Sequence, residues 1–202
     1  MSDVTRIALV GASGLIGQSL IRLAVGRGDI RVIAIARREI PLPKGARMEV
    51  LVADPENWAD AIAAANASVL VSALGTTWKK SGKDQAAFRS VDQELVLACA
   101  KAAKAAGMRQ MIAVSSVGAD AGAKNFYLRV KGEVEQQLGK LGLPRLDVLR
   151  PGLLRGHRDE LRPAERLGMV LSPLADLLMQ GKYRKYRSIR ADTMARAIVG
   201  LT

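Results

Sequence analysis

Short apolar runs alternate with amphipathic segments along most of the chain. The apolar runs are continuous rather than alternating, and each stops at a glycine, a serine or a charged residue. Continuous apolar strands are typical of a parallel sheet that is covered on both faces. The strands predicted in this way are Arg6–Val10, Arg31–Ala36, Glu49–Ala53, Ser68–Leu74, Met111–Ser116 and Leu146–Leu149.

Between these runs, apolar residues recur three or four positions apart, which is the spacing of a helix that buries one face. Helices are predicted over Ile16–Arg27, Asn57–Asn66, Asp84–Ala106, Asn125–Lys140 and Pro163–Gln180, with an edge strand near Tyr186–Ile189 and a last helix from Asp192. Alternating strands and helices with right-handed crossovers build an α/β protein. We therefore predict a doubly wound Rossmann fold with a mainly parallel sheet and a short C-terminal extension.

Length and composition narrow the class of protein. With 202 residues, 49% of them hydrophobic and 25% charged, we expect a single domain over 1–202, in which 151–202 form a small substrate-side region. One cysteine excludes a disulfide framework, and one cysteine with one histidine argues against a zinc site, so no metal is expected. No apolar run reaches the ~18 residues of a membrane helix. The first residues carry no secretory signal pattern, so we expect a cytoplasmic protein.

The charge is unusual, because 31 Lys and Arg against 19 Asp and Glu give a net +12. Such a surplus suggests a polyanionic partner, and the basic run 182–187 has interleaved tyrosines. Exposed edge strands also carry lysine and arginine, however, and an aromatic content of 3% leaves few rings to stack on bases. We expect a small-molecule substrate, no membrane and no specific nucleic-acid partner, with a homodimer or a protein partner left open.

A glycine-rich turn joins the first predicted strand to the first helix. Gly11, Gly14 and Gly17 form G-x-x-G-x-x-G, a variant of the dinucleotide fingerprint in its strand–turn–helix context. The first glycine allows the tight turn, the second lets the backbone approach a pyrophosphate, and the third lets the helix pack closely. The pyrophosphate then sits at the positive end of the helix. The cofactor-binding residues predicted here are Gly11, Ser13, Gly14, Leu15, Ile16 and Gly17.

The residues after the second strand indicate which dinucleotide is preferred. NAD sites place a carboxylate about 20 residues after the glycines, on the ribose 2′-hydroxyl. Here Arg37 and Arg38 occupy that place, and a guanidinium can clamp a 2′-phosphate. We therefore predict NADP(H), with NAD(H) less favoured. Asp54 either accepts a hydrogen bond from the adenine amino group or only forms a turn before Pro55.

Candidate catalytic groups follow the fifth strand. Ser115 and Ser116 close that strand, and Tyr127 and Lys131 stand four residues apart on a predicted helix, hence on one helix face. A nearby cation favours the phenolate, so Tyr127 is a candidate acid/base at neutral pH. Either serine could hold a substrate oxygen.

Together, the glycine turn, Ser115, Ser116, Tyr127 and Lys131 resemble the short-chain dehydrogenase/reductase superfamily, in its extended or atypical branch, over nearly the whole chain. The runs 115–120, 125–135 and 150–154, with Arg158 and Arg162-Pro163, are more narrowly similar to the Tat-interactive protein family of NAD(P)-binding, oxidoreductase or sugar-nucleotide epimerase-like proteins. Full members of the extended branch carry a larger C-terminal substrate domain than residues 152–202 provide.

The resemblance implies a role for each matching residue. Arg37 and Arg38 meet the adenosine phosphate, and Tyr127 is the proton donor and acceptor. Lys131 hydrogen-bonds the nicotinamide ribose. The further residues that it places along the cofactor are Leu74, Gly75, Leu154 and Arg162.

Two functions are compatible with these features. One is an NADP(H)-dependent oxidoreductase of a small carbonyl or alcohol, with a Ser-Tyr-Lys site and a nicotinamide that carries hydride. The alternative is a redox-sensing regulator that binds NADP(H) without turnover and acts through a protein partner. The retained Tyr127 and Lys131 favour the enzyme.

Overall fold

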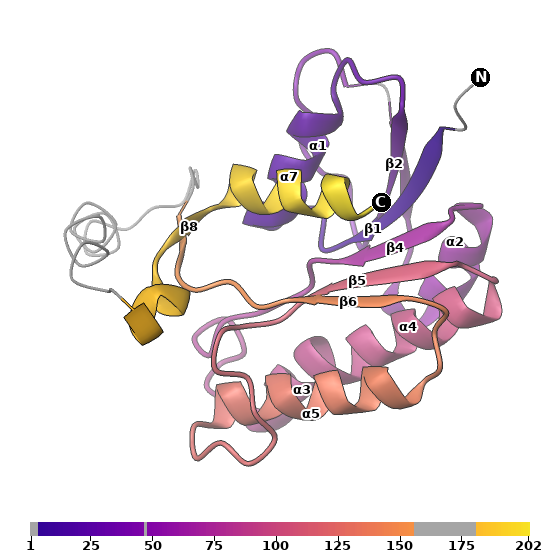
Figure 1. Ribbon diagram of the computed structural model, residues 1–202. Helices are drawn as coiled ribbons and strands as arrows, with labels where there is room; N and C mark the ends of the chain where they lie inside the picture. Colours follow the sequence, from indigo (N-terminus) through magenta and orange to yellow (C-terminus); the bar gives the residue numbers. More distant parts are fainter. Residues whose placement is uncertain (1–3, 47, 156–180) are drawn as a thin grey trace.

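The structure, a computed structural model, describes residues 4–46, 48–155 and 181–202. Its core is a six-stranded sheet in the order β3-β2-β1-β4-β5-β6 with every pair parallel (Figure 1). The strands are β1 (Thr5–Val10), β2 (Ile30–Ala36), β3 (Glu49–Val52), β4 (Val69–Ser72), β5 (Gln110–Val114) and β6 (Leu146–Leu149). The predicted α/β class with a doubly wound Rossmann fold is confirmed.

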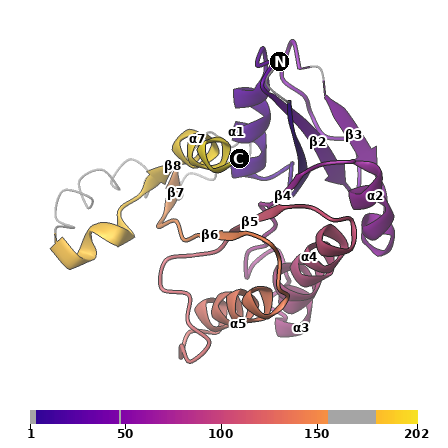
Figure 2. The same ribbon diagram turned by 45° about the vertical axis from the view of Figure 1, so that its right-hand side comes forward.

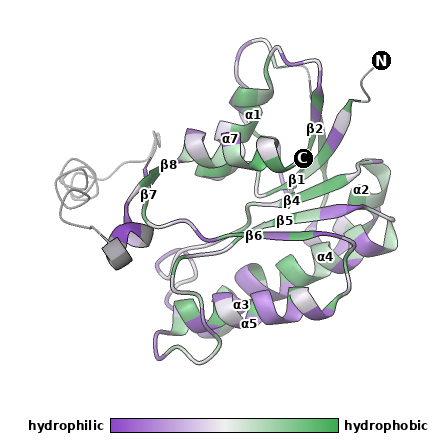
Figure 3. Cartoon of the chain, viewed as in Figure 1, coloured by the Kyte–Doolittle hydropathy of each residue, from purple (hydrophilic) through white to green (hydrophobic). Residues whose placement is uncertain are grey.

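The register of the central strand explains its unbroken apolar sequence. Ile7 of β1 lies beside Val32 of β2 and Val69 of β4, so both edges of β1 are paired. Helices cover both faces of the sheet, and Ile7 and Ala8, whose side chains point to opposite faces, are both fully buried. Figure 3 shows the hydrophobic colouring concentrated on these central strands.

Two helical layers enclose the sheet, as Figures 1 and 2 show. On one face α1 (Leu15–Ala24) and α7 (Ala191–Leu201) share an apolar cluster that includes Leu20 and Met194. The other face is covered by α2 (Trp58–Ala64), which follows the 3-10 turn η1 (Pro55–Asn57), and by α4 (Val96–Ala105) and α5 (Phe126–Lys140).

The long helix predicted over Asp84–Ala106 is interrupted. It consists of α3 (Gln85–Arg89), a π-helical segment η2 (Ser90–Leu95) and α4. Asp84 caps its start, because its carboxylate accepts a hydrogen bond from the N–H of Ala87 at 2.8 Å. The extent was therefore predicted correctly, but the uniform α-helical register was wrong. Short π-helical segments within α-helices occur frequently at functional sites.

The C-terminal part forms a second, small sheet. Strand β7 (Leu154–Arg155) pairs in parallel with β8 (Ile189–Arg190), after the 3-10 segment η3 (Gly181–Tyr186). The edge strand predicted near Tyr186–Ile189 is present, but it covers only Ile189–Arg190 and lies in this small sheet. The predicted helix Pro163–Gln180 lies outside the described residues. The division into a domain and a substrate-side region stays a prediction.

Candidate active site

The predicted site residues follow the strands at one edge of the sheet. The glycine turn follows β1, Arg37 follows β2, Leu74 follows β4 and Ser115 follows β5. In Figure 1 this carboxyl edge faces the side on which β7 and β8 lie. Open α/β sheets bind their ligands outside this edge, so the topology brings the predicted groups to one region.

Two of the three glycines are required by close packing within the turn. Gly11 has a φ of +85°, and a Cβ there would lie 2.4 Å from the backbone of Ala73. A Cβ at Gly17 would lie 2.4 Å from the carbonyl oxygen of Gly11. Gly14 is less crowded, since its nearest neighbour would be 3.2 Å away. The first and last glycines thus close the turn, and the middle one leaves its outer side accessible.

The turn also offers hydrogen-bond donors. Among the described residues, the backbone N–H groups of Ser13, Leu15 and Ile16 have no acceptor, while the side-chain amide of Gln18 donates to the carbonyl of Ala12 at 3.1 Å. These N–H groups lie at the positive end of α1, where an anion is stabilised. The turn therefore fits the pyrophosphate of a dinucleotide.

Arg37 and Arg38 lie just beyond β2, and both are exposed. Within the described part of the chain neither guanidinium has an ion pair or a hydrogen bond, whereas Arg31 at the other end of β2 pairs with Glu49 at 2.9 Å. Asp54 follows β3, is exposed, and its carbonyl accepts from the N–H of Asn57 at 2.9 Å. These two exposed guanidinium groups are therefore available to bind an anionic group.

The two serines differ in their surroundings. Ser115 is buried, and its hydroxyl has no hydrogen-bond partner among the described residues. Ser116 is half-buried, and its hydroxyl donates weakly to the carbonyl of Val117 at 3.4 Å. Burying a hydroxyl without a hydrogen-bond partner costs free energy. Of the two serines, Ser115 is therefore the one whose hydroxyl is available to bind a further polar group.

Helix α5 carries the tyrosine and the lysine. Asn125 caps its first turn by accepting from the N–H of Leu128 at 3.1 Å. The ring of Tyr127 is 38% exposed, whereas Lys131 is 5% exposed, and the ammonium lies 6.0 Å from the ring centroid. The predicted pairing of phenol and cation on one helix face is therefore present.

Asp92 is a site residue that the sequence analysis missed. It lies in the π-helical segment, its Oδ1 is 2.8 Å from Nζ of Lys131, and its Oδ2 accepts from the N–H of Thr76 at 2.7 Å. The Asp92 side chain is fully buried. The available signal was spacing, because Asp92 stands four residues from each of the buried Phe88 and Val96. A carboxylate on a buried face needs a partner, and Lys131 is that partner.

A second ion pair fastens α5 to the helix before it. Arg89 donates to Glu133 at 2.5 Å, and Gln93 donates to the same carboxylate at 3.4 Å. The hydrogen bond from Arg89 is the main cause that lowers the pKa of Glu133 below its ordinary value. This contact holds the start of α5, and with it Tyr127, against α3.

Four aromatic rings gather beside the tyrosine. Phe88 contacts Tyr127 and Phe126 with ring centroids 5.9 and 5.5 Å apart, and Trp78 contacts Phe126 at 5.5 Å. Arg89 and Arg129 lie over the ring of Phe126 at 5.5 and 5.8 Å. We call Trp78, Phe88, Phe126 and Tyr127 the aromatic cluster.

Not all predicted residues meet at one point. Gly75 lies beside Asp92, Gly11 beside Leu74, and Tyr127 beside Lys131. Arg37 and Arg38 follow β2 and Asp54 follows β3, on the other side of β1 from the strands that precede Leu74 and Ser115. Leu154 lies in the separate β7–β8 sheet, and Arg162 lies outside the described residues.

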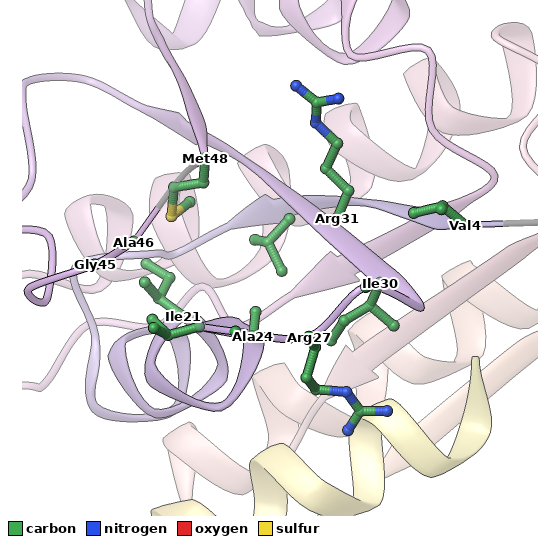
Figure 4. A pocket seen from close by; sticks show the side chains of 13 residues that line it. Val4, Ile21, Ala24, Arg27, Ile30, Arg31, Gly45, Ala46 and Met48 are labelled. Atoms are coloured by element: carbon green, nitrogen blue, oxygen red, sulfur yellow. The ribbon is translucent and has the colours of Figure 1, made fainter.

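A cavity of about 590 Å³ lies away from this edge. It is lined by the end of α1, the start of β2 and the loop before β3, including Ile21, Ile30 and Met48 (Figure 4). The guanidinium groups of Arg27 and Arg31 point away from each other there. These elements meet at the amino edge of the sheet, so the cavity is separate from the candidate site.

The fold and the glycine turn define a Rossmann-type nucleotide-binding protein. Residues 11–158 match the model of the NAD(P)H-binding family, and the chain belongs to this family. Curated relatives are the fungal proteins "fmp52, mitochondrial" of Emericella nidulans and "FMP52, mitochondrial" of Eremothecium gossypii. The first is 32% identical over 86% of this chain and 80% of its own length, and the second is 37% identical over 75% and 67%.

Solved structures confirm the fold. The UDP-glucose 4-epimerase of Thermus thermophilus in complex with NAD has a TM-score of 0.73 and 17% identity over 96% of this chain and 73% of its own. A short chain dehydrogenase family protein from Francisella tularensis has a TM-score of 0.66 and 14% identity, over 98% and 91%. The resemblance to short-chain dehydrogenases and epimerases thus holds at the level of the fold. The narrower resemblance to the Tat-interactive proteins stays a prediction, since these relatives carry the name Fmp52.

The names of the relatives correct the expected location. They are mitochondrial proteins by name, which points away from the cytoplasm, so the cytoplasmic prediction is wrong. That prediction rested on the lack of a secretory signal, and this lack does not distinguish between other compartments. In the described part of the chain, no helix is long and apolar enough to span a membrane.

Proposed function

We propose that this protein is an NADP(H)-dependent oxidoreductase that interconverts a small carbonyl compound and its alcohol. The observation that carries the proposal is the pairing of Tyr127 and Lys131, in which the ammonium of the buried lysine lies 6.0 Å from the ring centroid of the exposed tyrosine. The unpaired hydroxyl of Ser115, at the end of a neighbouring strand, supports it. The family match and the structure of a neighbour in complex with NAD support a nicotinamide dinucleotide as the ligand.

In this proposal each site residue has its own role in binding the cofactor or in the reaction. The N–H groups of the glycine turn hold the pyrophosphate, Arg37 and Arg38 bind the 2′-phosphate, and a bound nicotinamide supplies the hydride for the carbonyl carbon. Ser115 donates a hydrogen bond to the substrate oxygen. Tyr127 gives its hydroxyl proton to that oxygen, and Lys131 stabilises the phenolate that remains. Asp92 fixes the ammonium of Lys131 in place.

Calorimetry and turnover test the two halves of this proposal. NADP⁺ is expected to bind at least about tenfold more tightly than NAD⁺, because a guanidinium clamps the extra phosphate. The change Arg37→Ala should abolish this preference, whereas Arg31→Ala, at the other end of β2, should keep it. Equal affinity for both nucleotides would contradict the role of Arg37.

For turnover, NADPH oxidation is followed with a panel of aldehydes, ketones and quinones. Tyr127→Phe is expected to lower kcat by about 100-fold or more, because the proton donor is lost, and to leave the Kd of NADPH within about twofold. Tight NADPH binding with background turnover of every compound, unchanged in Tyr127→Phe, would instead indicate the regulator that binds NADP(H) without catalysis.

A further inference from the structure

The aromatic cluster contains four of the seven aromatic residues of the chain, and the proposed proton transfer uses only Tyr127. Phe88 is fully buried and serves as packing, but Trp78 remains 42% exposed. The other tryptophan, Trp58, is buried, and its indole N–H donates to the carbonyl of Ala53 at 2.9 Å. Trp78 packs on Phe126, the neighbour of the proposed proton donor Tyr127 in the sequence, so this exposed tryptophan is a candidate for ligand binding.

The loop of residues 75–84, which follows β4, holds Trp78 in a fixed orientation. Its start is fastened by the hydrogen bond from Thr76 to Asp92, and its end by the cap at Asp84. Within the loop, the carbonyl of Trp78 accepts from the hydroxyl of Ser81 and from the N–H of Lys83, both at 2.9 Å. The edge-to-face contact with the ring of Phe126 fixes the orientation of the indole ring. A ring that is already ordered loses little entropy when it stacks on a ligand.

The same loop carries three lysines. Lys79, Lys80 and Lys83 are exposed, and within the described residues none of their ammonium groups has an ion pair or a hydrogen bond. The carboxylate of Asp84 is engaged in capping α3. The loop thus carries an exposed apolar ring and three lysines whose ammonium groups have no ion pair within the described residues.

We propose that the substrate is an aromatic or similarly conjugated planar carbonyl compound that bears an acidic group. Its ring stacks on Trp78, in the same aromatic cluster as Tyr127, and its acid group faces the lysines of the loop. This inference rests on the proposed function, because it names the substrate class of the same site. Stacking on an indole and pairing with an ammonium group are independent contributions, so they can be tested separately.

Four aldehydes test separately how much the aromatic ring and the acid group of the substrate contribute to kcat/KM. They are 4-carboxybenzaldehyde, which has both features, benzaldehyde, cyclohexanecarboxaldehyde and succinic semialdehyde. In each reaction the aldehyde, NADPH and one proton give the alcohol and NADP⁺. We expect kcat/KM for 4-carboxybenzaldehyde to exceed that for each of the other three by at least about tenfold, which corresponds to about 1.4 kcal/mol.

Variants assign the two contributions to residues. Trp78→Ala should lower kcat/KM about tenfold for the two aromatic aldehydes and leave the two aliphatic ones nearly unchanged. The triple change of Lys79, Lys80 and Lys83 to Ala should act on the two acidic aldehydes. Matched controls on other surfaces are Leu42→Ala, which removes an equally exposed apolar side chain, and Lys101→Ala with Lys140→Ala on α4 and α5.

A binding measurement keeps this inference distinct from the proposed function. Terephthalate has the ring and charge but no reducible aldehyde, and it should quench tryptophan fluorescence in the wild type and not in Trp78→Phe. Quenching without turnover of these aldehydes or of any ketone or quinone in the panel would overturn the proposed function and support the ligand class. Turnover that is equal for all four aldehydes and independent of Trp78 would overturn the inference and leave the proposed function standing. If neither quenching nor turnover occurs, both proposals are wrong.

Discussion

Asp92 joins two parts of the candidate site through one buried carboxylate. One of its oxygens holds the backbone of the loop 75–84, and the other faces the ammonium of Lys131. Both side chains are buried, so each charge depends on the other for its stabilisation. Removing one member of a buried pair leaves an uncompensated charge, which costs far more than losing a pair at the surface.

Asp92→Asn should therefore reduce the free energy of unfolding by about 3–5 kcal/mol, because Lys131 loses its counter-charge inside the protein. Glu49→Gln, which breaks the surface pairs with Arg6 and Arg31, should change it by about 1 kcal/mol or less. Urea unfolding followed by circular dichroism measures both values. Combining Asp92→Asn with Lys131→Met should recover part of the loss, and equal costs for Asp92→Asn and Glu49→Gln would contradict a buried pair.

At the level of the element, α5 depends on one glycine to approach the loop that follows β5. A Cβ at Gly132 would lie 2.2 Å from the backbone of both Asp120 and Ala121. Arg129 reinforces the same contact by donating to the carbonyl of Ala123 at 3.0 Å. Because Lys131 precedes Gly132, the fit of this loop also sets the position of the lysine.

Gly132→Ala is expected to destabilise the protein by more than about 2 kcal/mol, since backbone atoms must move to admit the methyl group. Gly139→Ala, on the same helix with no atom within 4 Å of its Cβ, should instead stabilise by about 0.5–1 kcal/mol through helix propensity. Thermal unfolding compares the two variants. A loss of stability in both would show that helix α5, rather than the contact with the loop, is at fault.

The sequence predicts those elements that depend on local pattern. Strands such as Arg6–Val10, the glycine turn and the shared face of Tyr127 and Lys131 follow from runs and spacings of a few residues. The π-helical segment does not, because Phe88, Asp92 and Val96 have the spacing of a continuous α-helix, which gives no sign of the change in register. Strand β8 begins at the last residue of the predicted range, and its pairing with β7 was not predicted, because pairing between distant segments leaves no trace in local spacing.

At the level of the whole molecule, the reactivity of Cys99 is a probe of global unfolding. Cys99 is the only cysteine of the sequence, and it lies buried between α4 and the sheet. Burial raises the pKa of the Cys99 thiol from 9.0 to about 12. The native state thus holds this proton more tightly than the unfolded chain. The resulting stabilisation is complete below about pH 9 and is lost progressively as the pH rises towards 12.

Cys99 is expected to react with a disulfide reagent at pH 8 only as fast as the molecule unfolds. NADP⁺ should slow the reaction further, because a ligand that binds the native state lowers the unfolded population. The absorbance of the released thiolate measures the rate, with the protein in urea as the fully reactive control. Rapid labelling of the native protein would mean that α4 opens locally without global unfolding.

The packing of α7 on α1 determines when the protein can finish folding during its synthesis. Ile16 and Leu20 of α1 share their apolar cluster with Met194 and Ile198 of α7, and Arg22 lies 4.0 Å from Asp192. During synthesis, α1 leaves the ribosome long before α7, so the part of its apolar face that α7 covers stays exposed in the meantime. A nascent chain that stops before residue 191 therefore exposes apolar surface on α1 and is prone to aggregation and to chaperone binding. The fold is complete only when α7 has packed on α1.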